Sequence, residues 1–162
     1  MEVTFKLHLP REASSVPVVR GLCRSSFRTL GVEEDCLSDL ELAVTEACTN
    51  VLRHATGVGD EYEVEVTTTA TSVALRVKDA GAGFTPAAGS LDSAAAGASL
   101  AESGRGLHLM RVLVDDLRFV SDGASGTVVQ LEKSLRLRPD SPLAGAVGHA
   151  EARAADRHSY TD

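Results

Sequence analysis

The stretch Asp39–Ala55, DLELAVTEACTNVLRHA, has the residue spacing of an amphipathic helix, and the rest of the chain is interpreted around it. Apolar residues recur there at intervals of three and four, which places them on one stripe that begins just ahead of the quoted stretch: Leu37, Leu40, Val44, Ala47 and Val51. Glu46 and Asn50 lie four residues apart, so they stack on a neighbouring face, and Arg53 continues that line. The carboxylate can accept a proton and the amide oxygen can bind a hard cation, although such pairs also occur on plain solvated helix surfaces.

Length and composition restrict the class of protein. The 162 residues are enough for one domain with a substantial core, and 43% hydrophobic residues are too many for a disordered chain. The net charge of −7 disfavours nucleic acid as a direct partner, whereas a nucleotide remains compatible because backbone N–H groups and a metal ion can neutralise it locally. No apolar run approaches the ~20 residues that a membrane helix needs, so we expect no membrane association.

The cysteines indicate a reducing environment. Cys23, Cys36 and Cys48 show no metal-binding spacing, and each lies in a helical pattern, so we expect buried free thiols. Disulfides are rare in the cytoplasm, and free thiols therefore favour a cytoplasmic location. The alternating N-terminal stretch MEVTFKLHLP is not typical of a signal peptide, which agrees with this location.

Hydrophobic periods predict further helices and strands on both sides of the central stretch. The first helix is expected to turn five residues inward: Val16, Val19, Leu22, Cys23 and Phe27. The predicted elements, in chain order, are a strand over Glu2–Leu9, helices over Ala13–Leu30 and Glu33–Ala55, a hairpin of Tyr62–Thr69 and Ser72–Val77, a helix from Leu107, and strands over Leu117–Ser121 and Thr127–Leu135.

Two surface features are open to more than one interpretation. Arg20, Arg24 and Arg28 recur every four residues on the outer face of the first helix, either as ordinary solvated charge or as a docking strip for an acidic partner. From Pro139 onward the sequence loses every clear period, which predicts a flexible tail. A short Ala-rich helix within residues 143–155 is also compatible with the composition.

A glycine motif follows the second strand of the hairpin. It reads Asp79-Ala-Gly81-Ala-Gly83-Phe84, and two glycines at a strand end mark a turn that needs positive φ or a close approach by a ligand. Asp79, at the last position of the strand, can accept a hydrogen bond from a donor in that turn, such as the exocyclic amine of a purine. A plain Asp-initiated turn is the more common explanation of the motif when it stands alone.

A second glycine motif closes a long connection. Residues 85–103 are rich in Ala, Gly and Ser, and a loop of this length in a compact domain is often a lid. The loop ends in Gly104-Arg105-Gly106-Leu107, where a glycine-rich turn opens a helix. Free N–H groups and the helix dipole favour an anion there, and Arg105 would add a charge-assisted contact to a phosphate. Glycine before a helix is, however, usually only a turn.

The order of these motifs is more specific than any one of them. Glu46-x-x-x-Asn50 on a helix, DxGxGF at a strand end, a lid-length loop, GxG opening a helix and Gly126-Thr127 starting a strand resemble the histidine-kinase-like (GHKL) ATPase superfamily over roughly Glu2–Leu135. The segments VTEACTNVLRHA and SGRGLHLM are similar to the corresponding segments of the bacterial anti-sigma factor serine kinases of the RsbW type. The resemblance implies an α+β fold of Bergerat type, a two-layer α/β sandwich in which three main helices cover one face of a mixed, mostly antiparallel sheet.

The same resemblance implies a domain division and roles for the central residues. Residues 1–135 would form the ATP-binding domain, and residues 136–162 the flexible tail. Glu46 matches the catalytic base, and Asn50 matches the ligand of Mg²⁺. Asp79 matches the acceptor of the adenine amine, with Gly81 and Gly83 as the floor of that pocket.

The remaining matches lie around the phosphates and at the edge of the base. They are Gly104, Arg105, Gly106 and Leu107 at the phosphate-binding end of the lid, Thr127 at the polar edge of the adenine site, and Arg53 beside the phosphates. Lys78 stands next to Asp79, but strand alternation should point it to the other face of the sheet. Mg²⁺, Arg105 and backbone dipoles would therefore carry the phosphate charge.

The function that the resemblance implies is a cytoplasmic serine/threonine-protein kinase that depends on ATP and Mg²⁺ and doubles as an anti-sigma factor. It would sequester a sigma factor and phosphorylate an anti-anti-sigma antagonist, and the resemblance alone suggests a homodimer. An alternative is an ATP-gated binding module that holds a partner without phosphoryl transfer. A plain α/β domain with coincidental motifs is the third interpretation, and it predicts no Mg-dependent ATP binding.

Overall fold

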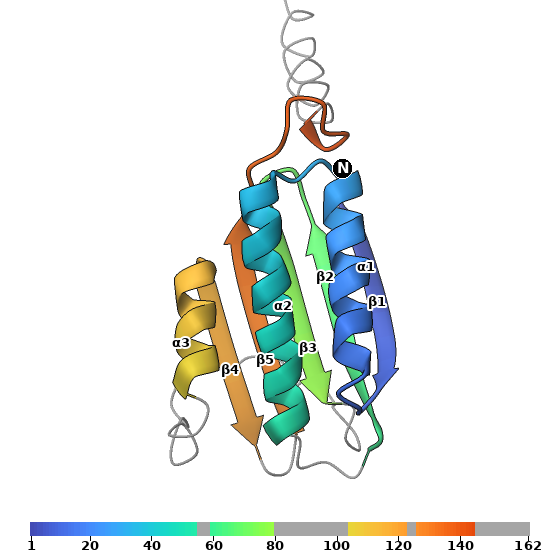
Figure 1. The fold of residues 1–162 in the computed structure, drawn as a ribbon, viewed down its shortest axis with the longest axis vertical. Helices are drawn as coiled ribbons and strands as arrows, with labels where there is room; N and C mark the ends of the chain where they lie inside the picture. The colour runs from blue at the N-terminus through green and yellow to red at the C-terminus, as the bar shows by residue number, and fades with distance from the viewer. Residues whose placement is uncertain (55–58, 80–103, 123–125, 145–162) are drawn as a thin grey trace, which may run out of the picture.

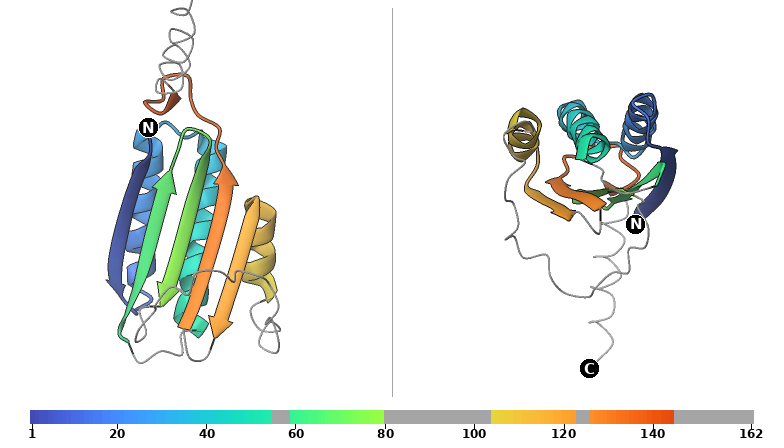
Figure 2. Two further views of the ribbon diagram at one scale, coloured as in Figure 1. Left: turned by 180° about the vertical axis from the view of Figure 1, so that it is seen from behind. Right: turned by 90° about the horizontal axis from the view of Figure 1, so that it is seen from below.

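The computed structural model describes residues 1–54, 59–79, 104–122 and 126–144. In these ranges three helices lie on one face of a five-stranded sheet, which gives the two-layer α+β sandwich that the resemblance predicts (Figure 1, Figure 2). The elements in chain order are β1 (Val3–Pro10), α1 (Ser15–Thr29), α2 (Glu34–His54), β2 (Glu61–Thr68), β3 (Ser72–Asp79), α3 (Gly104–Leu113), β4 (Asp116–Asp122) and β5 (Gly126–Ser134).

The sheet has the strand order β1-β2-β3-β5-β4, so the chain leaves β3, builds α3 and the edge strand β4, and returns with β5 beside β3. All four pairings between these strands are antiparallel, a stricter pattern than the mixed sheet that the resemblance implies. None of the helices in the described ranges combines the length and the apolarity that a membrane crossing requires.

The core lies between the helices and the sheet. The apolar stripe of α2 is fully buried over its whole length, as its spacing predicts: Leu37, Leu40, Val44, Ala47 and Val51. The prediction for α1 is wrong at Leu22, which is 45% exposed. The buried line of α1 follows Val19, Cys23 and Phe27 at intervals of four, and Leu22 lies one residue off that line.

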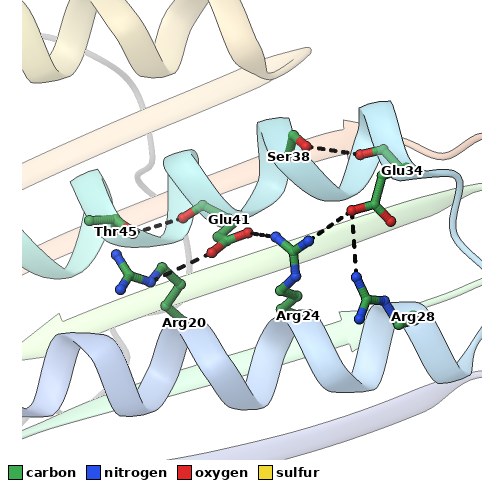
Figure 3. A network of polar contacts seen from close by, with 7 residues as sticks. All are labelled: Arg20, Arg24, Arg28, Glu34, Ser38, Glu41 and Thr45. Atoms are coloured by element: carbon green, nitrogen blue, oxygen red, sulfur yellow. Dashed lines mark hydrogen bonds and ion pairs between the residues drawn. The ribbon is translucent and has the colours of Figure 1, made fainter.

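The α1 arginines face α2, where they form a ladder of ion pairs between the two helices (Figure 3). Arg24 binds Glu41 and also lies 2.8 Å from Glu34. Arg20 lies 3.6 Å from Glu41, and Arg28 lies 3.5 Å from Glu34. The basic strip is therefore explained by helix–helix pairing, and the structure adds no support for a separate docking strip.

Residues 136–144 close over the connection between α1 and α2. Val32 forms an isolated β-bridge with Leu137, and Ser141 Oγ donates a 2.7 Å hydrogen bond to the carbonyl oxygen of Leu30. Leu143 is fully buried. The first part of the predicted tail thus packs against the domain, while residues 145–162 lie outside the described ranges.

Candidate functional site

The C-terminal half of α2 and the first turn of α3 meet at Gly106. A methyl group at Gly106 would lie 2.5 Å from Glu46 Oε2 and 3.7 Å from Asn50 Nδ2. Only a residue without Cβ lets the backbone of α3 come this close to the carboxylate. The acid and the amide of the Glu46-x-x-x-Asn50 motif therefore face the backbone of the Gly104-Arg105-Gly106 motif, although sixty residues of chain separate Glu46 and Gly106.

Asn50 has a buried side-chain donor without a partner among the described residues. Its side chain belongs to a residue that is only 3% exposed, and Nδ2 has no hydrogen-bond partner in the part of the chain that the structure describes. Buried amides of this kind are rare because leaving one unpaired costs roughly 1–3 kcal/mol. An acceptor oxygen of a ligand, such as a phosphate oxygen, would remove this cost because Nδ2 is a donor.

The donor set at this point suits Mg²⁺ bound together with phosphates. Among the described residues there is no cluster of three or more His, Cys, Asp and Glu side chains that could hold a metal by itself. Mg²⁺ commonly takes only one or two protein ligands and fills its other positions with water and substrate phosphates. The amide oxygen of Asn50 would be such a ligand, and both the Glu46 carboxylate and the Asn50 amide lie against the same point of the α3 backbone, at Gly106.

The glycine motif before α3 is part of the helix and not a turn ahead of it. α3 begins at Gly104, so Gly106 lies within its first turn, whose N–H groups have no partners inside the helix. Lys133 fixes the other end of α3, because its Nζ donates a 2.6 Å hydrogen bond to the Leu113 carbonyl and lies 3.0 Å from Asp39 on α2. The last turn of α3 is thereby tied to α2.

The second part of the site lies where β3 ends and β5 begins. The Asp79 side chain is fully buried and forms an ion pair with Arg11, and Thr127 is also fully buried. The β3–β5 register ends at Lys78 opposite Val128, and one further step sets Asp79 opposite Thr127. Lys78 lies on the other face of the sheet, 3.1 Å from Glu63, as strand alternation predicts.

These two parts share one end of the sandwich. Figure 1 shows the end of α2, the start of α3, the end of β3 and the start of β5 together at the lower edge of the molecule. The residues to which the resemblance assigns these roles thus come from four elements on the helix-covered side of the sheet. Arg53, in the last turn of α2, is exposed at the same end.

Some predicted site residues lie outside what the structure describes. Gly81 and Gly83 belong to residues 80–103, and the side chain of Arg105 is likewise outside the description. The roles that the resemblance implies for them stay predictions. Arg11 is the reverse case, since it lies against the site and no motif in the sequence indicates it.

The core beneath the site contains neutral groups. The Tyr62 hydroxyl forms a 2.7 Å hydrogen bond with Ser15 Oγ, and burial raises the pKa of Tyr62 to about 12. Burial also raises the pKa of the Cys23 and Cys48 thiols to about 12. The three cysteines are free and buried, as predicted, and Cys23 and Cys48 offer no reactive thiolate near neutral pH.

Comparison with known proteins gives consistent results for sequence and fold. The family model described as the histidine kinase-like ATPase domain matches residues 9–133. A serine-protein kinase RsbW of Halalkalibacterium halodurans is 30% identical over 138 residues, which are 82% of this chain and 84% of the relative. A serine-protein kinase RsbW of Bacillus cereus strain AH820 is 27% identical over 139 residues, covering 82% of this chain and 85% of the relative.

A solved structure has the same fold. The crystal structure of the RsbU and RsbW domains of a Mycobacterium tuberculosis protein superimposes with a TM-score of 0.59 at 21% sequence identity. The match covers 83% of this chain and 33% of that longer chain. At this identity the likeness concerns the arrangement of helices and strands, which is the arrangement that places the acid, the amide and the α3 backbone together.

Proposed function

Because this chain belongs to the histidine kinase-like ATPase family, we propose that it is an ATP-dependent serine/threonine-protein kinase that also acts as an anti-sigma factor. The relatives named serine-protein kinase RsbW support the kinase activity, since each match covers more than four fifths of both chains. The single observation that carries the proposal is the approach of Gly106 to the Glu46 carboxylate beside the buried amide of Asn50.

In the proposed reaction Glu46 is the general base. It accepts the proton of a seryl hydroxyl as that oxygen forms a bond to the γ-phosphorus, and the bond to the β–γ bridging oxygen breaks to release ADP. The support for this role is that the Glu46 carboxylate lies at the first turn of α3, where backbone N–H groups at a helix N-terminus favour a phosphate. The proposed proton acceptor lies on α2, and the backbone N–H groups proposed to bind the phosphates lie on α3, which packs against α2.

Asn50 would hold the metal through its amide oxygen, and Mg²⁺ when bound would neutralise charge on the phosphates. Asp79 and Thr127 would bind the adenine, with the Asp79 carboxylate accepting a hydrogen bond from the 6-amino group. Both residues are buried on the helix-covered face, where hydrogen bonds to a base would be shielded from water. The protein contributes mainly position and charge, which is what phosphoryl transfer requires.

The proposed partners are a sigma factor, which the protein would sequester, and an anti-anti-sigma antagonist, which it would phosphorylate. The support for them is the similarity to relatives named RsbW. A pull-down from the native cytoplasm with and without ATP would identify both partners. A homodimer is proposed on the same ground, and light scattering of the purified protein would test it.

Radiolabelled ATP and the captured antagonist test the reaction. Glu46→Ala should lower label transfer at least about 100-fold, because it removes the general base, while Mg-dependent ATP binding in a thermal-shift titration stays close to wild type. Glu41→Ala is the matched control, since Glu41 is an acid on the same helix that pairs with Arg24 on α1 and lies away from α3.

Three outcomes separate the interpretations. Transfer by Glu46→Ala at the wild-type rate would show that the assigned base is wrong. ATP binding without label on the antagonist would favour an ATP-gated binding module that transfers no phosphate. Absence of Mg-dependent ATP binding by the wild-type protein would reject the nucleotide function as a whole.

A further inference from the structure

Arg11 connects three strands at the end of the sheet that carries the site. It directly follows β1, and its backbone N–H donates a 2.7 Å hydrogen bond to the carbonyl oxygen of Asp60, just before β2. Its guanidinium Nη2 donates to Oδ1 of Asp79, the last residue of β3. β2 lies between β1 and β3, so the Arg11 side chain reaches past one strand to bind the carboxylate.

The ion pair is fully buried on the carboxylate side and half-buried on the guanidinium side. The Asp79 side chain is 0% exposed and the Arg11 side chain is 18% exposed. A carboxylate in such a place needs a charged partner or several hydrogen-bond donors, and a guanidinium supplies fixed, planar N–H groups that limit how the carboxylate can rotate. The orientation of Asp79 therefore depends on Arg11, a residue 68 positions away in the sequence.

We propose that Arg11 is a positioning residue for base recognition, which orients the Asp79 carboxylate so that it selects a purine with a 6-amino group. This inference rests on the proposed nucleotide function. A carboxylate that accepts from Arg11 presents acceptor oxygens to the base. An adenine amine donates to such an oxygen, whereas the 6-oxo group of hypoxanthine or guanine is itself an acceptor and meets it with repulsion.

Discrimination of this kind is sensitive to orientation. A site built to hydrogen-bond one group rejects an analogue that lacks it, because buried polar atoms are then left unpaired. If the Asp79 carboxylate could turn away, it would bond elsewhere and the 6-oxo purine would meet less repulsion. If Arg11 limits this rotation and acts through Asp79 alone, its effect should appear in the preference between purines more than in the overall affinity.

The test compares ATP with inosine triphosphate, which has a 6-oxo group in place of the 6-amino group. Dissociation constants are measured with Mg²⁺ by isothermal titration calorimetry for wild type, Arg11→Lys, Arg11→Gln and Arg11→Met. We expect wild type to prefer ATP, Arg11→Lys to retain part of this preference, and Arg11→Gln and Arg11→Met to lower the ATP-to-inosine-triphosphate ratio at least about tenfold. Arg24→Met is the matched control, because it breaks an ion pair between α1 and α2 and should leave the ratio unchanged.

The possible results are distinct. Equal weakening of both nucleotides in the Lys and Gln variants would mean that the ion pair is structural only, and tighter ATP binding by Arg11→Gln would mean that Arg11 competes with the base. Either result overturns the inference. If Arg11→Met does not fold by circular dichroism, the Lys and Gln variants alone decide the ratio. Failure of wild type to bind ATP would instead reject the proposed function on which the inference rests.

Discussion

The two ends of α2 differ in how their polar groups are paired. At the N-terminal end, Ser141 Oγ donates to the Leu30 carbonyl at 2.7 Å and accepts from the Leu143 N–H at 3.1 Å, so the connection to α1 is closed by hydrogen bonds. At the C-terminal end, Asn50 Nδ2 lacks a hydrogen-bond partner among the described residues. One end is arranged for stability, and the other keeps polar groups available at a cost to stability, as functional sites commonly do.

Two glycines, one near each end of α2, show the same difference between the two ends. Gly31 has a φ of 81° in the α1–α2 connection, and a methyl group there would lie 2.6 Å from Ser141 Cβ and 2.7 Å from Ser141 Cα. At Gly106 the nearest atom to such a methyl group is the terminal carboxylate oxygen of Glu46. The backbone of Ser141 can shift only at a high energetic cost, whereas the end of the Glu46 side chain can rotate away. Alanine at Gly31 should therefore affect stability, and alanine at Gly106 should affect activity.

The largest expected effect is on stability, at Gly31. Gly31→Ala combines a strained backbone angle with a clash against the Ser141 backbone and should lower the free energy of unfolding by about 3 kcal/mol. Urea denaturation measures this directly, and the melting temperature should fall by roughly 6–12 °C. ATP binding per folded molecule should stay unchanged, because the site is at the other end of α2.

Gly21→Ala is the control for Gly31. Gly21 lies inside α1, and a methyl group there would have no atom within 4 Å, so the substitution should stabilise the protein by about 0.5–1 kcal/mol through helix propensity. A loss below 1 kcal/mol for Gly31→Ala would contradict the tight closure by residues 136–144.

Gly106→Ala should leave stability nearly unchanged and reduce function. The methyl group must displace the Glu46 carboxylate, and misplacing a reacting group by about 1 Å commonly lowers a rate about 100-fold. Label transfer to the antagonist measures the rate, and urea denaturation measures stability. Unchanged transfer in a folded Gly106→Ala protein would show that the close approach of α3 to Glu46 is not needed for the reaction.

The sequence predicts most features that depend on spacing within one helix or strand, and it misses contacts between residues far apart in the chain. The buried stripe around Leu40 and Val44 follows from spacing within one helix, and Asp79 ends its strand where alternation and glycine place it. Leu22 is predicted on the wrong side because α1 is apolar on two faces, and only packing against α2 decides which face is buried.

Long-range side-chain pairs have no local signature. Ser141 and Leu30 are 111 positions apart, and the sequence predicts Leu30 as the end of a helix and Ser141 as part of the tail. The approach of Gly106 to Glu46 could be expected only through the family resemblance, because spacing places each residue within its own helix and does not position one helix against another. Tertiary contacts of this kind become visible only in the folded structure.

Asn50→Leu should separate ligand binding from stability at the site end. Leucine has a similar size and no amide to leave unpaired, so the free energy of unfolding should stay equal or rise by up to about 1 kcal/mol. Mg-dependent ATP affinity should fall at least about tenfold, because the amide oxygen is the proposed metal ligand. Asn50→Asp is the control, since it keeps an oxygen ligand for Mg²⁺ and loses the neutral amide.

One outcome for Asn50→Leu would contradict this expectation. A drop in stability of more than about 2 kcal/mol in Asn50→Leu would mean that the amide has an essential structural partner, and the interpretation of its Nδ2 as available to a ligand would then be wrong. Calorimetric titration with ATP, in the presence and absence of Mg²⁺, distinguishes loss of the metal contribution from loss of nucleotide binding in general.

The smallest expected effect is on the ion pairs between α1 and α2. Arg24 is 35% exposed and Glu41 26% exposed, so water and salt screen their attraction, and a double-mutant cycle of Arg24→Met with Glu41→Gln should give a coupling energy below about 1 kcal/mol. The loss is limited further because Glu41 keeps Arg20 and Glu34 keeps Arg28 when Arg24 is removed. The coupling should decrease in 1 M NaCl, where the Debye length is about 3 Å. A salt-independent coupling above 2 kcal/mol would instead place this ladder with the buried contacts of the N-terminal end, and the closure of that end would then depend on charge as much as on the hydrogen bonds of Ser141.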